Sequence, residues 1–425
     1  MITLLIIIFV FGYIFIATEH TIKINKAATA LITGVLCWVV YITAAENKEL
    51  VTEELTEHLG ELSGILFFLL GAMTIVELID AHNGFELITS RITATNKRKL
   101  LWIVSLITFF LSPLLDNLTT TIVMISMVRK FIKSPEDRMY FTGMIVIASN
   151  AGGAWSPIGD VTTTMLWIGG QVTAAKIVSS LLLPSLVCML VPLSVLSYRM
   201  KGDVQRPDKA ENGKSSDITI SQQKIVLFSG ILILILVPVF KTITHLPPYM
   251  GILIGLGMLW IITELIHGKK DDEDKQALSV AYALQKIDTP SILFFLGILL
   301  SVASLQVTGV LTQMADWMNV HIANDNIILL AMGLLSSVVD NVPLVAAAQG
   351  MYSMATYPTD HYFWEFLAYS TGSGGSALII GSAAGVAAMG MESISFGWYL
   401  RKISLLALAG FFAGAGVYML LGSGL

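Results

Sequence analysis

The stretch SPLLDNLTTTIVM at residues 112–124 and the stretch SSVVDNVPLVAAA at residues 336–348 decide the fold of this chain. Each places an Asp-Asn pair, Asp116-Asn117 or Asp340-Asn341, inside apolar sequence. A carboxylate at bilayer depth costs roughly 2.5 to 3.5 kcal/mol even on insertion scales, so such an acid marks a functional site by default. Two matching acidic segments therefore indicate a transporter.

The composition predicts an all-α polytopic membrane protein. The chain has 425 residues, of which 55% are hydrophobic and 13% charged, about half the charged fraction of a soluble protein. Its apolar runs approach the length that a helix needs to cross about 30 Å of hydrocarbon. Backbone satisfaction in lipid favours a helical bundle. The first run, 2–17, is expected to be a retained span because it lacks the flanks of a signal peptide.

Other classes of protein are disfavoured. The net charge of −5 offers no basic surface for nucleic acid. Cys37 and Cys188 lie within apolar runs, where a small buried thiol is the ordinary role. No metal-ligand cluster or nucleophile-base pair is evident, so the sequence predicts neither an enzyme nor a bound cofactor.

The distribution of Lys and Arg predicts the topology. These residues gather in segments 23–26, 91–99, 129–138, 199–214, 269–286 and 401–402. By the positive-inside rule these segments are cytoplasmic. Residues 46–61 are acidic, and residues 287–400 contain no Lys or Arg. We expect the loops in these two regions to face outward.

Both Asp-Asn stretches are predicted to form re-entrant hairpins. Both flanks of 100–128 are basic, and one straight helix there would run about 44 Å. Two arms turning at Ser112-Pro113 and Asp116-Asn117 fit better. Residues 324–354 are expected to form the second hairpin, entering from outside. Such hairpins are tolerated only where the tip is buried in protein or lines a wet cavity.

The remaining sequence predicts an inverted repeat. Ten spans are expected near 2–17, 27–45, 62–81, 140–170, 177–198, 223–240, 249–267, 290–308, 362–392 and 403–422. A polar linker at 201–222 separates two five-span halves, 1–200 and 223–425. Because five is odd, the halves have opposite orientations. Inverted repeats with interrupted helices place a substrate site near the midplane.

Small and turn-forming residues interrupt one span in each half. They are Asn150, Gly152, Gly153, Ser156, Pro157 and Gly159 in span 140–170, and Gly372, Ser373, Gly374, Gly375 and Ser376 in span 362–392. In transporters, the carbonyls and half-helix ends freed by such breaks bind ions. The alternative is that the glycines serve close helix packing.

Two acids in the first half are the candidate ligands of a transported Na⁺ or Li⁺. Asp116 and Asp160 are accompanied by hydroxyls and amides, from Thr119, Thr120, Ser149, Asn150, Thr162 and Thr163. Hard cations prefer such oxygen ligands. Burial favours a protonated carboxylate and a nearby cation favours the ionised one, so proton and cation can compete. Each acid could instead hydrogen-bond a hairpin backbone N–H.

The second half is poorer in ligands. Pro343 and Leu344 stand where Thr119 and Thr120 stand in the first half, and Ser382 stands where Asp160 does. Asp340 could contact the ion, sense protons or stabilise its hairpin tip.

A titratable group ends the third span. Glu77, Asp80 and His82 lie at its cytoplasmic end, and His82 titrates in the physiological range. The group could tune the pH response, although a solvated interfacial His82 is favoured. The other histidines, His267 among them, fall in expected loops and are given no role.

The segments SPLLDNLTTTIVM, SNAGGAWSPIGDVTTTM, SSVVDNVPL, STGSGGSALIIGSAAGV and TIVELIDAHNGF resemble those of NhaD-type sodium/proton antiporters of the ion-transporter superfamily. The resemblance covers most of the chain from about residue 60. It implies an inverted-repeat fold with a scaffold, a mobile transport domain and homodimerisation through the scaffold. The implied ion pathway includes Asp116, Asn117, Asn150, Asp160, Thr162, Thr163, Asp340, Ser373 and Ser376.

The sequence therefore predicts a secondary sodium or lithium/proton antiporter of a bacterial cytoplasmic membrane, which extrudes the cation in pH homeostasis by alternating access. The main alternative is a sodium-coupled carboxylate or oxyanion symporter, against which the acids of both hairpin tips argue. A passive ion channel is a further alternative, distinguished by faster flux without obligatory proton exchange.

Overall fold

The computed structural model describes residues 1–89, 92, 94–205, 218–268, 278–322 and 324–422. Within these ranges the chain is helical, with no strand beyond the isolated bridge between Asn96 and Asp203. Eight of the described helices are long and apolar enough to cross a membrane. The predicted all-α polytopic class is confirmed. Residues 206–217 of the predicted linker lie outside the described residues.

The first half contains the helices between residues 2 and 199. They are α1 (Ile2–Ala17), α2 (Glu19–Ile22), α3 (Lys26–Ala44), α4 (Lys48–Ala81), α5 (Glu86–Thr89), α6 (Lys97–Leu115), α7 (Asn117–Phe131), α8 (Pro135–Ala154), α9 (Val161–Ile168) and α10 (Ala174–Arg199). Helices α6 and α7 form the first hairpin, and α8 and α9 are the two parts of the first broken helix.

The second half repeats this order with a few additional short helices. It contains α11 (Ile220–Thr244), α12 (Pro248–His267), α14 (Val280–Lys286), α15 (Thr289–Val307), α16 (Val310–His321), α17 (Asp325–Leu335), α18 (Asn341–Met351), α19 (Tyr362–Gly374), α20 (Ala383–Glu392), α21 (Phe396–Tyr399), the π-helical turn η1 (Leu400–Ser404) and α22 (Leu405–Gly422). Helices α17 and α18 form the second hairpin, and α19 and α20 the second broken helix.

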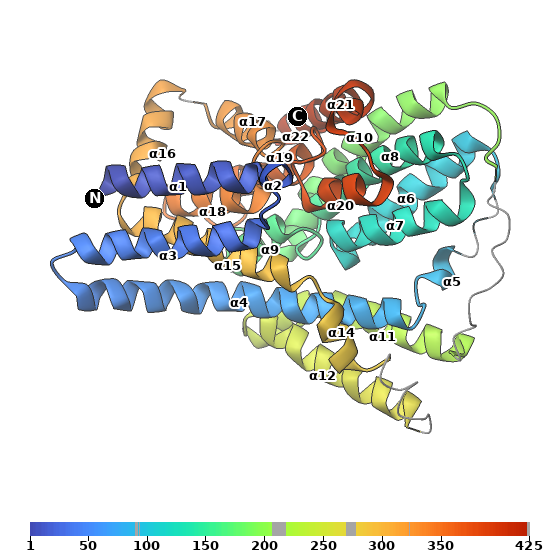
Figure 1. Ribbon diagram of the computed structural model, residues 1–425, viewed down its shortest axis with the longest axis horizontal. Helices are drawn as coiled ribbons and strands as arrows, with labels where there is room; N and C mark the ends of the chain where they lie inside the picture. Colours follow the sequence, from blue (N-terminus) through green and yellow to red (C-terminus); the bar gives the residue numbers. More distant parts are fainter. Residues whose placement is uncertain (90–91, 93, 206–217, 269–277, 323, 423–425) are drawn as a thin grey trace.

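The contacts between helices show the repeat directly. Helix α3 packs on α15 as α12 packs on α4, and α6 packs on α8 as α17 packs on α19. Helix α7 crosses to α20 of the other half, as α18 crosses to α9. The first hairpin lies at the right of Figure 1 and the second at the left. The two halves are thus equivalent units, and their hairpins enter the molecule from opposite ends.

Equivalent side chains hold each hairpin against its broken helix. Ser112 Oγ donates to the carbonyl of Ser149 at 2.6 Å, and Ser336 Oγ donates to the carbonyl of Thr371 at 2.8 Å. Gly374 lies so close to the carbonyl of Gly333 that a Cβ would collide with it. A Cβ on Gly152 would likewise collide with the carbonyl oxygen of Phe109, at 2.5 Å. The glycines therefore permit close helix packing, which was the alternative role considered for them.

The helix limits correct several predictions. The acidic segment is not a loop, because residues 48–61 belong to α4, whose 34 residues extend for about 51 Å. Pro113 lies inside α6, and the chain turns at Asp116, whose φ is 72°. The break of the first discontinuous helix spans 155–160, and that of the second spans 375–382. Asn150 and Gly372 therefore lie within helices rather than in the breaks.

Candidate ion-binding site

Polar residues begin the helices that start at the centre of the molecule. Asp116 is the N-cap of α7, Asp160 of α9, Asp340 of α18 and Ser382 of α20. A capping carboxylate or hydroxyl accepts hydrogen bonds from the free backbone N–H groups of the first turn. The positive end of each helix dipole then faces the same region. The three aspartates that sequence reasoning selected as ion ligands thus also define the local structure.

Asp160 is the centre of this region. Its Oδ1 accepts hydrogen bonds from Thr162 N at 2.9 Å and from Thr162 Oγ1 at 2.6 Å. Its Oδ2 accepts from Asn117 Nδ2 at 2.7 Å. Asn341 Nδ2 lies 3.4 Å from both oxygens. The asparagines of both hairpin tips therefore converge on one buried carboxylate, which is 1% exposed.

An amide network extends from Asp160 to the second broken helix. Asn117 Nδ2 also donates to Asn150 Oδ1 at 3.0 Å, and Asn150 Nδ2 donates to Ser382 Oγ at 2.9 Å. All of these residues are buried. Asp160 and Ser382 occupy equivalent places in the two halves, so the network joins the two broken helices through residues of α7 and α8.

Asp116 lies beside this network without a cationic partner among its described contacts. Its carboxylate accepts from Thr119 N at 2.7 Å and from Thr119 Oγ1 at 3.0 Å. This is the hairpin-capping bond that was the structural alternative. With Asn117, Asp116 also lines a cavity of about 60 Å³ between α4, α9 and the first hairpin. The carboxylate therefore adjoins space that a small ion can occupy.

Asp340 has a different environment from Asp116. Its Oδ2 lies 3.1 Å from Lys26 Nζ, which comes from the start of α3. Asp340 Oδ1 accepts from Val342 N at 3.3 Å as the cap of α18. Lys26 also lies over the ring of Phe294, 4.2 Å from its centroid. The second hairpin tip is thus held by an ion pair that the sequence analysis did not foresee.

Several predicted ligands lie outside the Asp160 network. Thr120 Oγ1 and Ser373 Oγ are buried without a hydrogen-bond partner among the described atoms. Thr163 Oγ1 donates to the carbonyl of Ala154 at 3.5 Å, and Ser376 Oγ to that of Ser373 at 2.7 Å. The structure therefore brings together Asn117, Asn150, Asp160, Thr162 and Asn341, places Asp116 and Thr119 beside them, and leaves the four hydroxyls elsewhere.

His82 is buried, so the expectation of a solvated histidine is wrong. Its Nδ1 lies 2.7 Å from the carbonyl of Leu78, and its Nε2 lies 2.8 Å from Nε2 of His267. His267, which was given no role, is the last residue of α12 and is also buried. Asp80 is exposed and Glu77 is partly exposed. The histidine pair therefore joins the ends of α4 and α12.

Sequence reasoning missed Lys26 and the contribution of Ser382. Ser382 was recognised only as the replacement of Asp160, and its equivalent position was the signal that could have assigned it to the site. Lys26 and Asp340 are separated by 314 positions in sequence. No local pattern connects them, so only the folded chain could show this pair.

Known proteins are similar to this chain over most of its length. A family model described as CitMHS, citrate transporter, matches residues 13–372. Sodium/proton antiporter 1 of Arabidopsis thaliana is 48% identical over 413 residues, which are 97% of this chain and 71% of the plant protein. The Na(+)/H(+) antiporter NhaD of Vibrio cholerae is 30% identical over 425 residues, covering 91% of this chain and 84% of that protein.

A solved structure shares the fold. The YdaH transporter of Alcanivorax borkumensis, whose structure is described as having an unusual topology, superposes with a TM-score of 0.59 and covers 90% of each chain at 12% identity. Fold and central polar site together define a polytopic transporter built from inverted repeats. The chain belongs to the CitMHS family and, within it, is of the NhaD type that the sequence motifs resemble.

Proposed function

We propose that this protein exchanges Na⁺ or Li⁺ for protons, extruding the cation from the cell by alternating access. The observation that carries the proposal is the convergence of Asn117 and Asn341, from oppositely entering hairpins, on the carboxylate of Asp160. The names of the plant and bacterial relatives, which are sodium/proton antiporters, support the same activity.

Competition for Asp160 couples the two ions in this proposal. A small cation replaces the N–H donors around the carboxylate, and the amides of Asn117 and Asn341 turn so that their oxygens face it. Oxygen ligands of this kind suit a hard cation. When the cation leaves, a proton neutralises the carboxylate, because an uncompensated charge at this depth is costly. Asp116, which adjoins the small cavity, is the second acid available to the cation or to a proton.

Alternating access requires that the site be exposed first to one side and then to the other. We infer that the helices carrying the site, α6 to α9 and α17 to α20, move against the helices α1, α3, α4, α11, α12 and α15. The two groups of helices pack chiefly among themselves. Each hairpin tip lies at the boundary, where α4 adjoins Asp116 and α3 adjoins Asp340.

The family description makes a sodium-coupled citrate or oxyanion symporter the alternative. A carboxylate substrate at this site would face Asp116 and Asp160, and like charges repel strongly in a medium of low dielectric constant. Lys26, the cation at the second tip, is engaged by Asp340. The charges of the site therefore favour a cation as the transported ion.

Proteoliposomes with a trapped pH-sensitive dye test the proposal. The expected result is proton movement driven by Na⁺ or Li⁺, with little response to K⁺ or citrate. Asp160→Asn should abolish the response, whereas Asp316→Asn, the same change at an exposed position of α16, should leave it intact. Sodium-dependent uptake of labelled citrate without countermovement of protons would overturn the assignment in favour of symport.

We further propose that the protein acts as a homodimer in a bacterial cytoplasmic membrane. The resemblance to the NhaD type supports the dimer, and the bacterial relatives support the location. The plant relative points to a plant membrane as the alternative. The mass of the purified protein in detergent by light scattering tests the dimer, and membrane fractionation of the native source tests the location.

A further inference from the structure

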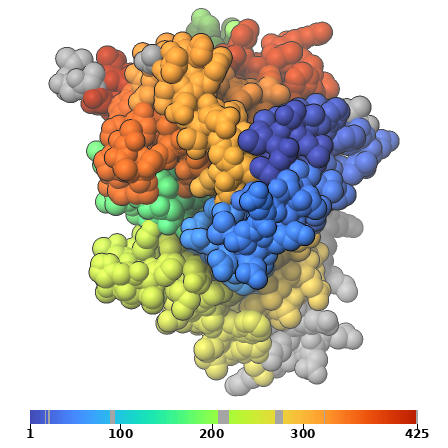
Figure 2. All heavy atoms as spheres, turned by 90° about the vertical axis from the view of Figure 1, so that its left-hand side faces the viewer, coloured from blue at the N-terminus to red at the C-terminus, as the bar shows by residue number. Residues whose placement is uncertain are grey.

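A second and larger cavity lies away from Asp160. It has a volume of about 680 Å³ and is enclosed by α4, the end of α9, the start of α12, α15 and α18. Figure 2 looks onto the end of the molecule where α4 and α12 begin. By the distribution of basic residues this end is the predicted outer side. The side chain of Glu61, in the cavity lining, is 70% exposed, so the cavity is open to its surroundings.

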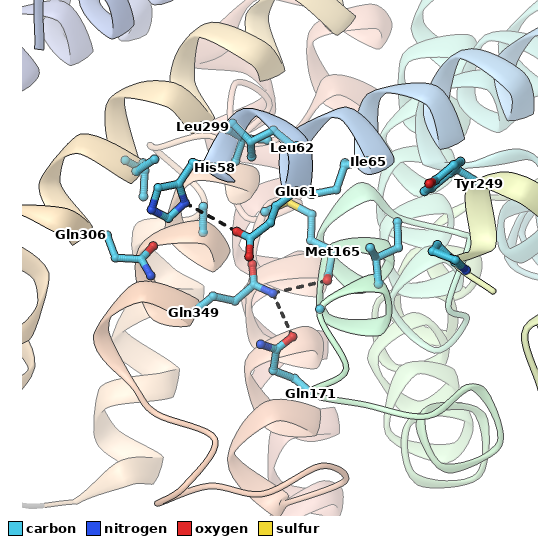
Figure 3. A pocket seen from close by; sticks show the side chains of 18 residues that line it. His58, Glu61, Leu62, Ile65, Met165, Gln171, Tyr249, Leu299, Gln306 and Gln349 are labelled. Carbon is cyan, nitrogen blue, oxygen red and sulfur yellow. Dashed lines mark hydrogen bonds and ion pairs between the residues drawn. The ribbon is translucent and has the colours of Figure 1, made fainter. Parts of the chain in front are cut away.

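The polar lining of this cavity suits a hydrated cation. Among the described residues that line it, Glu61 is the one acid, and none is lysine or arginine. Figure 3 shows the side chains of Glu61 and Gln349 pointing toward one another, with His58 beside Glu61. His58 Nδ1 lies 3.5 Å from Glu61 Oε2. A carboxylate in a lining without lysine or arginine attracts cations and repels anions.

Glutamine side chains are fixed beneath Glu61. The amides of Gln349 and Gln171 are 2.9 Å apart, and Gln349 also bonds the carbonyl of Met165 at 3.3 Å. Gln306 lines the same space from α15. An amide can present either an oxygen or an N–H group. The cavity therefore offers amide oxygens as well as a carboxylate, which are ligands for a hard cation.

The large cavity and the small cavity beside Asp116 follow one another along the same two helices. On α4, Ile65 lines the large cavity and Leu69 the small one. On α9, Met165 lines the large cavity and Thr164 the small one. A path from the outer side to Asp116 would pass through both.

An aromatic contact joins the lining of the small cavity, which includes Phe68, to Trp167, whose neighbours Met165 and Ile168 on α9 line the large cavity. Phe68 and Trp167 meet edge to face with centroids 6.2 Å apart, and both are buried. Lys241 Nζ of α11 donates to the carbonyl of Trp167 at 2.6 Å and lies 4.8 Å from the ring centroid. These contacts join α9 to α4 and α11, which belong to the other group of helices. A movement of α9 must break them.

We propose that the large cavity is a second cation site, in which Glu61 and the glutamine amides hold hydrated Na⁺ or Li⁺ on the outer side, and that the contact of Phe68 with Trp167 closes it from Asp116 and Asp160. This inference rests on the proposed antiport. Glu61 concentrates the cation at the entrance and is not part of the exchange centre. Its loss therefore weakens apparent affinity from the outer side without lowering the maximal rate.

Sided kinetics in proteoliposomes of known orientation test the site. Glu61→Gln should raise the KM for Na⁺ added from the cavity side about fivefold, the effect of one charge at contact distance in water, while the maximal rate and the KM from the opposite side stay unchanged. Glu61→Asp should restore most of the affinity. Glu57→Gln is the matched control, since Glu57 is exposed one turn earlier on α4 and does not line the cavity.

The outcomes separate the two proposals. If the wild type exchanges Na⁺ for protons and Glu61→Gln keeps its KM, the second site is refuted and the antiport stands. If the wild type shows no exchange driven by Na⁺, both proposals fall.

Cysteine labelling tests the closure without measuring transport. In a background with Cys37→Ala and Cys188→Ala, Ala346→Cys in the large cavity should react with a membrane-impermeant thiol reagent, and Na⁺ should slow the reaction. Ala72→Cys in the small cavity should not react until Phe68→Ala is added. Equal labelling of both cysteines in the presence of Phe68, or no labelling of Ala346→Cys, would overturn the proposed arrangement.

Discussion

The two hairpin tips have the same Asp-Asn sequence and different chemistry. The asparagines behave alike, because Asn117 and Asn341 both reach Asp160. The aspartates do not, since Asp340 is paired with Lys26 whereas Asp116 accepts hydrogen bonds from Thr119 and lines a cavity. The two tips therefore share their geometry, whereas Lys26 of α3 neutralises the acid of the second tip alone.

The largest effect expected from this difference concerns Asp116. Asp116→Asn should abolish exchange, because it removes the acid that adjoins the small cavity. Asp340→Asn should reduce exchange only in part, because Asp340 is already neutralised by Lys26. Sodium-driven pH changes in vesicles measure the exchange activity of both variants. Normal exchange by Asp116→Asn would refute a role of Asp116 in ion binding.

Lys26 offers a way to remove the difference between the tips. Lys26→Met leaves Asp340 without its cation, and a lost hydrogen bond to a charged group costs about 1.5 to 3 kcal/mol. We expect slower exchange and a lower melting temperature. The double variant Lys26→Met with Asp340→Asn should recover much of both, because no unpaired charge remains. A double variant worse than the sum of the single ones would show that the ion pair itself is needed.

The close contacts of Gly152 and Gly374 with the hairpin arms are a feature that the two halves share. Gly152→Ala and Gly374→Ala should destabilise the protein by similar amounts, about 1 to 3 kcal/mol. In each variant the new Cβ would collide with a backbone carbonyl oxygen of the neighbouring hairpin arm. Gly390→Ala is the control, as it is exposed on α20 with open space around it. Thermal unfolding in detergent measures all three. A large effect at only one of the two equivalent glycines would break the symmetry of the contact.

The smallest effect is expected at the histidine pair. The Nε2 atoms of His82 and His267 are close enough to share one proton, and a second proton between them would break this hydrogen bond because both nitrogens would then be donors. His82→Gln should therefore shift the pH profile of exchange by less than about one unit with little change in maximal rate. His245→Asn, at an exposed left-handed position after α11, is the control. An unchanged profile would leave the pair as a packing contact between α4 and α12.

The hairpins could be predicted because an acid within apolar sequence is costly in lipid unless it serves a site. Asp116 and Asp340 indeed mark the turns. The limits of the helix breaks could not be predicted, because Gly152 and Gly374 serve helix contacts within α8 and α19 rather than turns. The acidic start of α4 was mistaken for a loop since charge alone does not end a helix beyond the hydrocarbon. The pairs Lys26 with Asp340 and His82 with His267 join distant segments, so no local pattern reveals them.

In the proposed mechanism a metal ion and a proton compete for Asp160. Addition of Na⁺ to the purified protein in weakly buffered detergent solution tests it without any membrane gradient. We expect the wild type to release protons on addition of Na⁺ or Li⁺, and Asp160→Asn to release far fewer. Equal proton release by the wild type and by Asp160→Asn would contradict it.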